Sequence, residues 1–270
     1  MSKRIAIVGT APSWVDTPWH DLDLKIWSLN DAYLCRDWKG QGIPRADRWF
    51  DLHPLDKFVY RKADQKVIYA NQVPPGYYVR PDGHLDWLKQ QAKTIPVYLQ
   101  QEPPAGWPAH AQRFPIEAVT ERFGDYWASG PSYMVALAIL EGATEIHVYG
   151  IHLSTQHEYI DQRPNFERML GIAQGLGITV VMAQTSPVLK HGWKYGYQPK
   201  PEPVTHPAEQ AMHEAHSQRA KLLKAMAGWP WWRRRTAVTD RLRRLEALEQ
   251  DFQLQIMQTR PSSVVRVRAA

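Results

Sequence analysis

The chain has 270 residues, 44% of them hydrophobic and 22% charged, a composition typical of a globular protein that can bury a sizeable core. A single cysteine, Cys35, excludes an internal disulfide and fits a reducing compartment. No segment approaches the roughly 20 apolar residues of a membrane span, and the apolar run 5–8 is too short for a signal peptide, so we expect a cytoplasmic protein without a membrane partner.

The net charge of +6 is unevenly distributed along the chain. Residues 205–270 contain 12 Lys and Arg against 6 Asp and Glu, whereas residues 1–204 contain 21 of each. A basic segment attached to a neutral body indicates a polyanionic partner. The chain also has 12 tryptophans, for which packing in the core and stacking on sugars or bases both remain open.

The first half of the chain alternates short apolar runs with polar segments. A short amphipathic helix is predicted for residues 84–94, and the Pro-rich segments 62–81 and 101–115 are predicted to be irregular. The apolar runs are rich in β-branched and aromatic residues, which predicts buried strands. These predicted strands are 5–8, 26–29, 48–52 and 96–99.

The second half contains the clearest strand-and-helix signal of the chain. Ser129 or Ser132 can cap a helix in which Pro131 occupies the first turn. The run 133–140 is apolar on all sides, which predicts a buried helix, and Gly142 is expected to end it. The alternation predicts an α/β protein with a Rossmann-like parallel sheet and helices on both faces. The elements that follow are a strand at 145–150, a helix at 165–176 and a strand at 178–182.

We predict two domains in this chain. Residues 1–197 form the Rossmann-like nucleotide-binding domain, and residues 198–270 form a basic helical hairpin with a tail. The hairpin is predicted from the helical periodicity of 207–226 and 236–257, whose apolar stripe packs on the body or on another copy of the chain. The last residues, 260–270, are expected to be a loose basic tail.

Small and polar residues follow several of the predicted strands, where ligands bind in open parallel sheets. Gly9 opens the loop Gly9-Thr10-Ala11-Pro12-Ser13, and a side chain there would keep a phosphate from the backbone N–H groups. Ser129-Gly130, before the buried helix, is a second candidate for anion binding. A plain strand-ending turn and simple helix capping remain the alternatives. Other polar residues expected at this edge are Asn30, Asp31, Asp51, His53, Tyr149, His152, His157, Glu158, Tyr159, Asp161, Gln162 and Arg163.

Several common sites are disfavoured by the pattern. The loop at Gly9 matches neither the Walker loop nor the GxGxxG fingerprint, which disfavours a kinase of that type and a dehydrogenase. Asp21-Leu22-Asp23 is formally a DxD sequence, but its place between two strands predicts a surface loop. His152 and His157 do not share a helix face and do not form a zinc pair. We therefore predict no metal site, and we interpret Cys35 as a buried, unreactive residue.

Two segments, Gly9–Ser13 and Ser129–Gly150, resemble the bacterial sialyltransferases that use CMP-sialic acid. The flagellin glycosyltransferase-like and hydroxymethylpterin diphosphokinase-like proteins share this layout. The chain is also similar to a group of tailed-phage proteins through Ser28–Asn30, Trp49–Pro54 and Gln162–Pro164. The resemblance covers residues 3–197 and implies a nucleotide-binding Rossmann-like fold.

The resemblance also implies roles for individual residues. In the sialyltransferases, a Gly-x-Gly-Pro-Ser-type loop, an Asn after the second strand and a Ser-Gly pair hold the CMP part of the donor. The general base of that family is a His in the loop before the next helix. Without gaps, that position holds Gln162 in this chain, and His157 lies five residues earlier. The nucleotide contacts implied by the resemblance are Gly9, Thr10, Ala11, Pro12, Ser13, Asn30, Ser129, Gly130 and Tyr149.

The lead hypothesis is a glycosyltransferase-like enzyme that uses a UDP-, GDP- or CMP-sugar. His157, supported by Asp161 or Glu158, would deprotonate the acceptor hydroxyl, and Arg163 or Tyr149 would stabilise the leaving phosphate. The phage-like resemblance and the basic segment predict a hydroxylated base in phage DNA as the acceptor, in the cytoplasm of a bacterial host. The residues expected to hold the opened DNA strand are Trp231, Trp232, Arg233, Arg234, Arg235, Arg241 and Arg244.

Two other functions remain open. A diphosphokinase or another nucleotide-processing enzyme on the same scaffold would use ATP and magnesium, with Asp21, Asp23 and Asp51 as metal ligands. A non-catalytic phage protein that binds nucleic acid or a host protein would keep the fold without turnover. It would show salt-dependent DNA binding that survives the loss of His157.

Overall fold

The computed structural model describes residues 3–61, 78–154, 158–190, 194–198 and 264–267, together with Glu214, Ser217, Gln218 and Lys221. The chain divides into two compact units. The first consists of Met1–Lys190 and Ser263–Ala270, and the second of His191–Ser262. The four single residues lie within the predicted helix 207–226 and are helical, and the predicted helix 236–257 lies outside the described residues.

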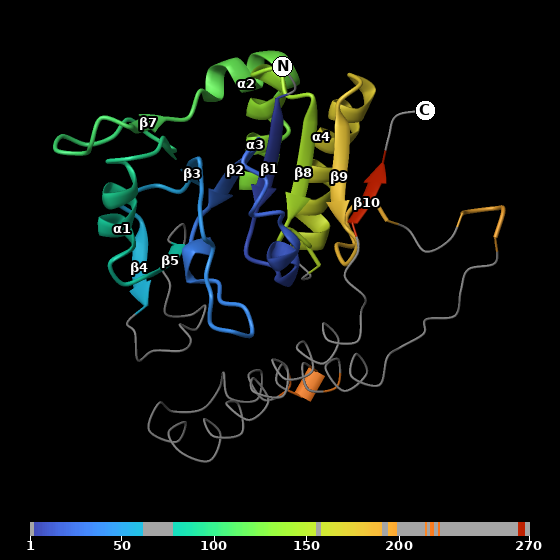
Figure 1. The fold of residues 1–270 in the computed structure, drawn as a ribbon, viewed down its shortest axis with the longest axis horizontal. Helices are drawn as coiled ribbons and strands as arrows, with labels where there is room; N and C mark the ends of the chain where they lie inside the picture. Colours follow the sequence, from blue (N-terminus) through green and yellow to red (C-terminus); the bar gives the residue numbers. More distant parts are fainter. Residues whose placement is uncertain are drawn as a thin grey trace. The chain divides into compact units, whose positions relative to one another are not determined.

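The first unit is built on one eight-stranded sheet (Figure 1). The sheet has the strand order β10-β9-β8-β1-β2-β3-β6-β7, and every pair in it is parallel except β9 with β10. The predicted α/β class and the parallel Rossmann-like sheet are therefore confirmed. The strands are β1 (Arg4–Val8), β2 (Leu24–Leu29), β3 (Arg48–Asp51), β6 (Val97–Leu99), β7 (Ala111–Arg113), β8 (Glu145–Tyr149), β9 (Thr179–Ala183) and β10 (Val264–Val267).

The order of the strands reverses at β1. From β1 the chain runs outward through β2, β3, β6 and β7, and it then returns to place β8 on the other side of β1. In open parallel sheets this reversal leaves a crevice at the carboxyl ends of the two strands where it occurs, and ligands bind there. The fold thus selects the ends of β1 and β8, at Val8 and Tyr149, as the place to look for a site.

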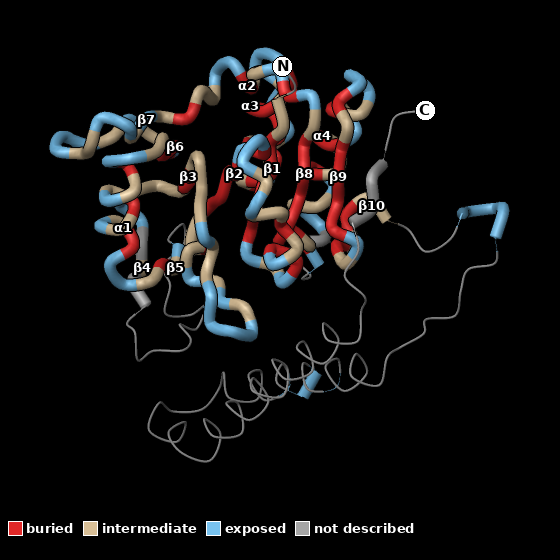
Figure 2. The backbone as a smooth tube through the Cα atoms, in the orientation of Figure 1, coloured by how far each residue is buried: buried red, intermediate tan, exposed pale blue. Residues whose placement is uncertain are grey.

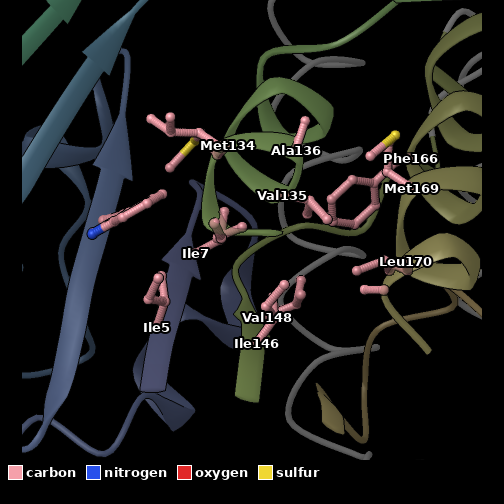
Figure 3. Packing of buried hydrophobic residues seen from close by; sticks show 14 of the residues in the cluster. Ile5, Ile7, Met134, Val135, Ala136, Ile146, Val148, Phe166, Met169 and Leu170 are labelled. Atoms are coloured by element: carbon pink, nitrogen blue, oxygen red, sulfur yellow. The ribbon is translucent and has the colours of Figure 1, made fainter. Parts of the chain in front are cut away.

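Helices cover both faces of the sheet, as the sequence predicts. α3 (Gly130–Leu140) and α4 (Arg163–Gly175) pack on the face that carries Ile5 and Ile7 of β1 and Val148 of β8 (Figure 3). The opposite face carries Trp49 of β3, against which Leu88 of α1 packs. The other helices in the described part of this unit are α1 (His84–Gln91), α2 (Ile116–Phe123), the 3-10 helices η1 (Pro12–Asp16) and η2 (Ala32–Leu34), and the π-helix η4 (Glu158–Gln162).

The central strands form the most buried part of this unit, because both of their faces are covered (Figure 2). Of the two roles left open for the tryptophans, packing in the core applies to Trp14, Trp27 and Trp49, which are at most 6% exposed, whereas Trp38 is 87% exposed. Among the described helices, none combines the length and apolar character needed to cross a membrane.

Three strands form where irregular chain is predicted. β5 (Tyr78–Pro81) pairs with β4 (Phe58–Arg61) in a separate two-stranded parallel sheet, and β7 extends the main sheet beside β6. β10 pairs with β9, so the tail is not loose at Val264–Val267. All three strands are short, and each is stabilised by pairing with a strand elsewhere in the chain. A short stretch of sequence therefore does not show the pattern of a strand.

Candidate functional site

The loops that follow β1 and β8 touch each other through two glycines. The Gly9 N–H donates to the Tyr149 carbonyl at 2.9 Å, and the Ala11 N–H donates to the Gly150 carbonyl at 2.8 Å. A Cβ at Gly9 would lie 2.4 Å from the Gly150 oxygen, and Gly150 itself has a φ of +64°. The close approach of the opposite loop therefore requires a glycine at this position. The predicted contact of Gly9 with a phosphate stays a prediction.

Ser13 links the same two loops through its side chain. Its buried hydroxyl oxygen accepts a hydrogen bond from the Gly150 N–H at 2.9 Å and lies 2.9 Å from Nε2 of His152. The loops after β1 and β8 together therefore hold the half-buried imidazole of His152 at the point where the strand order reverses. Sequence reasoning placed His152 at this edge but gave it no role, because nothing local shows its pairing with a residue in the first loop.

The start of α3 lies beside the end of β2. A Cβ at Gly130 would lie 3.4 Å from the Leu29 side chain. Ser129 occupies the N-cap position as predicted, but it makes no side-chain cap bond, because its hydroxyl lies 2.6 Å from that of Ser132. The first N–H groups of an α-helix have no acceptor within the helix, and its N-terminus carries a partial positive charge. The carboxyl edge is therefore electrostatically suited to an anion.

Asn30 turns the chain sharply at the end of β2. Its φ is +51°, in the left-handed region that residues other than glycine seldom adopt. The Asn30 N–H donates to the Phe50 carbonyl at 2.9 Å, and the Trp49 indole donates to the Asn30 carbonyl at 3.0 Å. Two hydrogen bonds to β3 thus stabilise the turn, and both use the backbone of Asn30.

Tyr149 points along the sheet face rather than into solvent. It is 2% exposed, and its hydroxyl lies 3.5 Å from Nδ1 of His147, whose Nε2 lies 3.0 Å from Glu145. These three residues alternate along β8 and therefore share one face. The implied contact of Tyr149 with a phosphate stays a prediction.

A second polar cluster surrounds Asp51 at the end of β3. This carboxylate is fully buried and is hydrogen-bonded to His84 Nε2 at 2.6 Å and to His53 Nδ1 at 2.9 Å. It also forms an ion pair with the Arg80 guanidinium, whose Nε lies 3.3 Å away. Arg80 also contacts His53. Burial alone would raise the pKa of Asp51, but the hydrogen bonds from the two histidines and the Arg80 charge hold that pKa well below its usual range.

The cluster extends from Asp51 to Tyr33 in η2. An ionised carboxylate only accepts hydrogen bonds, so His84 donates from Nε2, and its Nδ1 lies 3.1 Å from the Tyr33 hydroxyl. Burial, with help from the charges of Asp31 and Asp51, raises the pKa of Tyr33 to about 12, so the phenol keeps its proton at neutral pH. Sequence reasoning missed His84, because a histidine at the start of an amphipathic helix carries no local chemical signal.

Of the predicted catalytic residues His157, Asp161 and Arg163, the structure describes the last two. Asp161 is exposed in η4. The Arg163 guanidinium bonds Glu167 at 2.8 Å and the Pro187 carbonyl at 2.6 Å, and it joins α4 to the loop after β9. Their catalytic roles stay predictions. His157 lies outside the described residues. So do the predicted DNA-binding residues, which are Trp231, Trp232, Arg233, Arg234, Arg235, Arg241 and Arg244.

No metal site emerges in the part of the chain that the structure describes: no three His, Cys, Asp or Glu side chains are grouped to hold an ion. Asp21 is paired with Arg4 at 2.8 Å, and Asp23 is exposed next to the amino end of β2. Cys35 is only half-buried, with its Sγ 3.7 Å from the Thr10 carbonyl. Burial, together with the Asp31 charge, raises the pKa of this thiol to about 11, which agrees with the predicted lack of reactivity.

No family model and no curated protein matches the chain. Solved structures of the sialyltransferase CstII from Campylobacter jejuni are similar at 14% identity. The complex with cytidine-5′-monophosphate has a TM-score of 0.37 and covers 67% of this chain and 79% of that chain. The complex with CMP-3FNeuAc has a TM-score of 0.36, with 68% and 82% covered. At these TM-scores the likeness assigns neither a ligand nor a reaction to the present chain.

Proposed function

We propose that this protein is a glycosyltransferase-like enzyme that binds a nucleotide-activated sugar at the carboxyl edge of β1, β2 and β8. The observation that carries the proposal is the joining of the two loops where the strand order reverses. There Gly9 meets Gly150 backbone to backbone, and Ser13 bonds both Gly150 and His152. This is the place at which open α/β sheets bind nucleotides.

Different polar groups at this edge suit different parts of a nucleotide sugar. The N-terminus of α3, at Ser129 and Gly130, suits a phosphate through its N–H groups and its dipole. His152, positioned by Ser13, suits the charge that grows on the leaving phosphate. His157, the predicted base, follows His152 closely in the sequence, so a proton acceptor and a phosphate-binding group would come from one short stretch of the chain.

The donor is proposed as a UDP-, GDP- or CMP-sugar. The sequence resemblance to CMP-sialic-acid enzymes supports this choice, because the residues that carry it include the loop Gly9–Ser13 and the start of α3. DNA as the acceptor is a finer proposal that depends on the basic segment 205–270. Mass spectrometry of nucleosides from hydroxymethylated DNA, after incubation with a panel of nucleotide sugars, tests it.

A thermal-shift screen of the full chain with CMP, UDP, GDP and ATP, with and without magnesium, tests nucleotide binding. A nucleotide present at 100 times its Kd stabilises the folded protein by about 2.7 kcal/mol. We expect CMP, UDP or GDP to raise Tm without magnesium, and the matching nucleotide sugar to be slowly hydrolysed. Stabilisation by ATP that requires magnesium would point to the diphosphokinase instead.

Matched histidine variants connect the binding to the site. His152→Gln should weaken nucleotide binding about tenfold, because the imidazole held by Ser13 is lost. His110→Gln is the control, since His110 is exposed and precedes β7 at the opposite edge of the sheet. The proposal fails if no nucleotide shifts Tm, or if both variants bind as tightly as the parent.

A further inference from the structure

We infer that the carboxylate of Asp31 binds the ribose hydroxyls of the nucleotide, so that the enzyme selects ribonucleotides over 2′-deoxyribonucleotides. The inference rests on the proposed function, because it assigns a residue to the sugar end of the same nucleotide. Asp31 would determine specificity for the sugar, a role that neither the loop Gly9–Ser13 nor the start of α3 fills.

The position of Asp31 is the first support. Ser28 of β2 pairs with Val8 of β1, so both strands end together at the edge where the loop after Gly9 begins. Asp31 lies two residues beyond the end of β2. The helix η2 that it precedes reaches this loop, since Cys35 Sγ lies 3.7 Å from the Thr10 carbonyl. Asp31 therefore stands beside the loop of β1, on the side away from β8.

The second support is that the carboxylate has no structural partner. Asp31 occupies the N-cap position of η2, where an aspartate usually accepts a backbone N–H, but its side chain makes no cap bond. Within the described ranges of the chain, no hydrogen bond or ion pair involves its carboxylate. Asp21 and Asp47, the aspartates that flank β2 and β3, are instead paired with Arg4 and Arg45.

The third support is the separation of charge along the edge. The positive end of α3 and the imidazole of His152 suit a phosphate, whereas a carboxylate repels one. A carboxylate only accepts hydrogen bonds, and a vicinal diol offers two O–H donors to its two oxygens. In Rossmann folds that bind dinucleotides, an acidic residue about 20 residues after the glycine-rich turn accepts a hydrogen bond from the ribose 2′-OH. The sugar end is thus the part of a nucleotide that Asp31 can bind.

The test measures the affinity of the full chain for ribonucleotide and 2′-deoxyribonucleotide pairs by titration calorimetry, namely CMP with dCMP, UMP with dUMP and GMP with dGMP. Asp31→Ala is compared with Asp23→Ala, which removes an exposed carboxylate at the opposite end of the same strand. Circular dichroism and Tm confirm that both variants are folded.

The parent protein should bind the ribonucleotide of the preferred pair at least tenfold more tightly than its deoxy form. Asp31→Ala should abolish most of this difference by weakening the ribonucleotide alone, and Asp23→Ala should preserve it. Equal binding of both forms by the parent, or an equal loss of both in Asp31→Ala, overturns the role of Asp31 but leaves the nucleotide site standing. Failure of every nucleotide to bind the parent overturns the proposed function and, with it, this inference.

Discussion

Gly9 and Gly150 face each other without room for a single carbon atom between their backbones. A Cβ on Gly150 would lie 2.3 Å from the Gly9 oxygen, and one on Gly9 would lie 2.4 Å from the Gly150 oxygen. These nearest atoms belong to the backbone of the two loops that directly follow the paired strands β1 and β8, and they cannot rotate away as a side chain can. This contact positions Ser13 and His152 for the proposed site.

Gly9→Ala should therefore destabilise the protein by about 1–3 kcal/mol, the usual cost of overpacking a rigid interior. Urea unfolding followed by fluorescence should show a lower midpoint with an unchanged slope. The same variant should lose nucleotide binding by more than its stability explains, because the two loops separate. Unchanged stability would contradict the close approach of the loops.

Gly171→Ala is the matched control and a prediction of its own. Gly171 is an exposed residue inside α4, and a Cβ there meets nothing within 4 Å. Alanine reduces the conformational entropy lost by a helical glycine, so this variant should stabilise the protein by about 0.5–1 kcal/mol. Opposite signs for the two substitutions in the same urea titration separate crowding from backbone entropy.

Asp51→Asn should be among the most destabilising conservative changes in the protein. It removes the charge that compensates the buried Arg80 and one acceptor of the two histidines. Breaking a buried ion pair on one side costs about 3–5 kcal/mol. Chemical denaturation measures the loss, and Glu117→Gln, which breaks the exposed pair with Arg113, should leave the midpoint unchanged.

The lowered pKa of Asp51 predicts that the free energy of unfolding decreases at acid pH. A carboxyl whose pKa is lower in the folded than in the unfolded state stabilises the protein above the unfolded value of about 3.9. That contribution decreases as the pH falls below about 4, toward the pKa of the folded state. Denaturation midpoints between pH 7 and pH 3 should show that the parent and Asp51→Asn converge as the pH falls. A constant difference across this range would argue against an ionised Asp51.

Cys35 should react slowly in the folded protein. With a pKa of about 11, its thiolate fraction at pH 8 is lower than that of an ordinary cysteine by about a hundredfold, and alkylation slows in proportion. Iodoacetamide labelling followed by mass spectrometry measures the rate, and the urea-unfolded chain provides the reference for a free thiol. Equal rates in the two states would refute the effect of burial on this group.

The local pattern of apolar residues, glycines and prolines was sufficient to predict the main helices and strands of the fold. Short apolar runs predicted β1, β2, β3, β6, β8 and β9 to within two residues at each end, because a buried strand needs little beyond apolar side chains. Pro131 near its start and Gly142 just after its end similarly predicted α3. β5, β7 and β10 escaped prediction because each depends on a partner strand that the local sequence does not identify.

The amino-acid sequence by itself determined which residues end the strands, and thus which polar groups stand at the carboxyl edge. Only the tertiary structure decided which of them meet: Gly9 with Gly150, Ser13 with His152, and Asp51 with His84. Two of these pairs join residues more than a hundred positions apart. Strand order sets such contacts, and it results from the packing of helices on both faces of the whole sheet rather than from the preferences of any one segment.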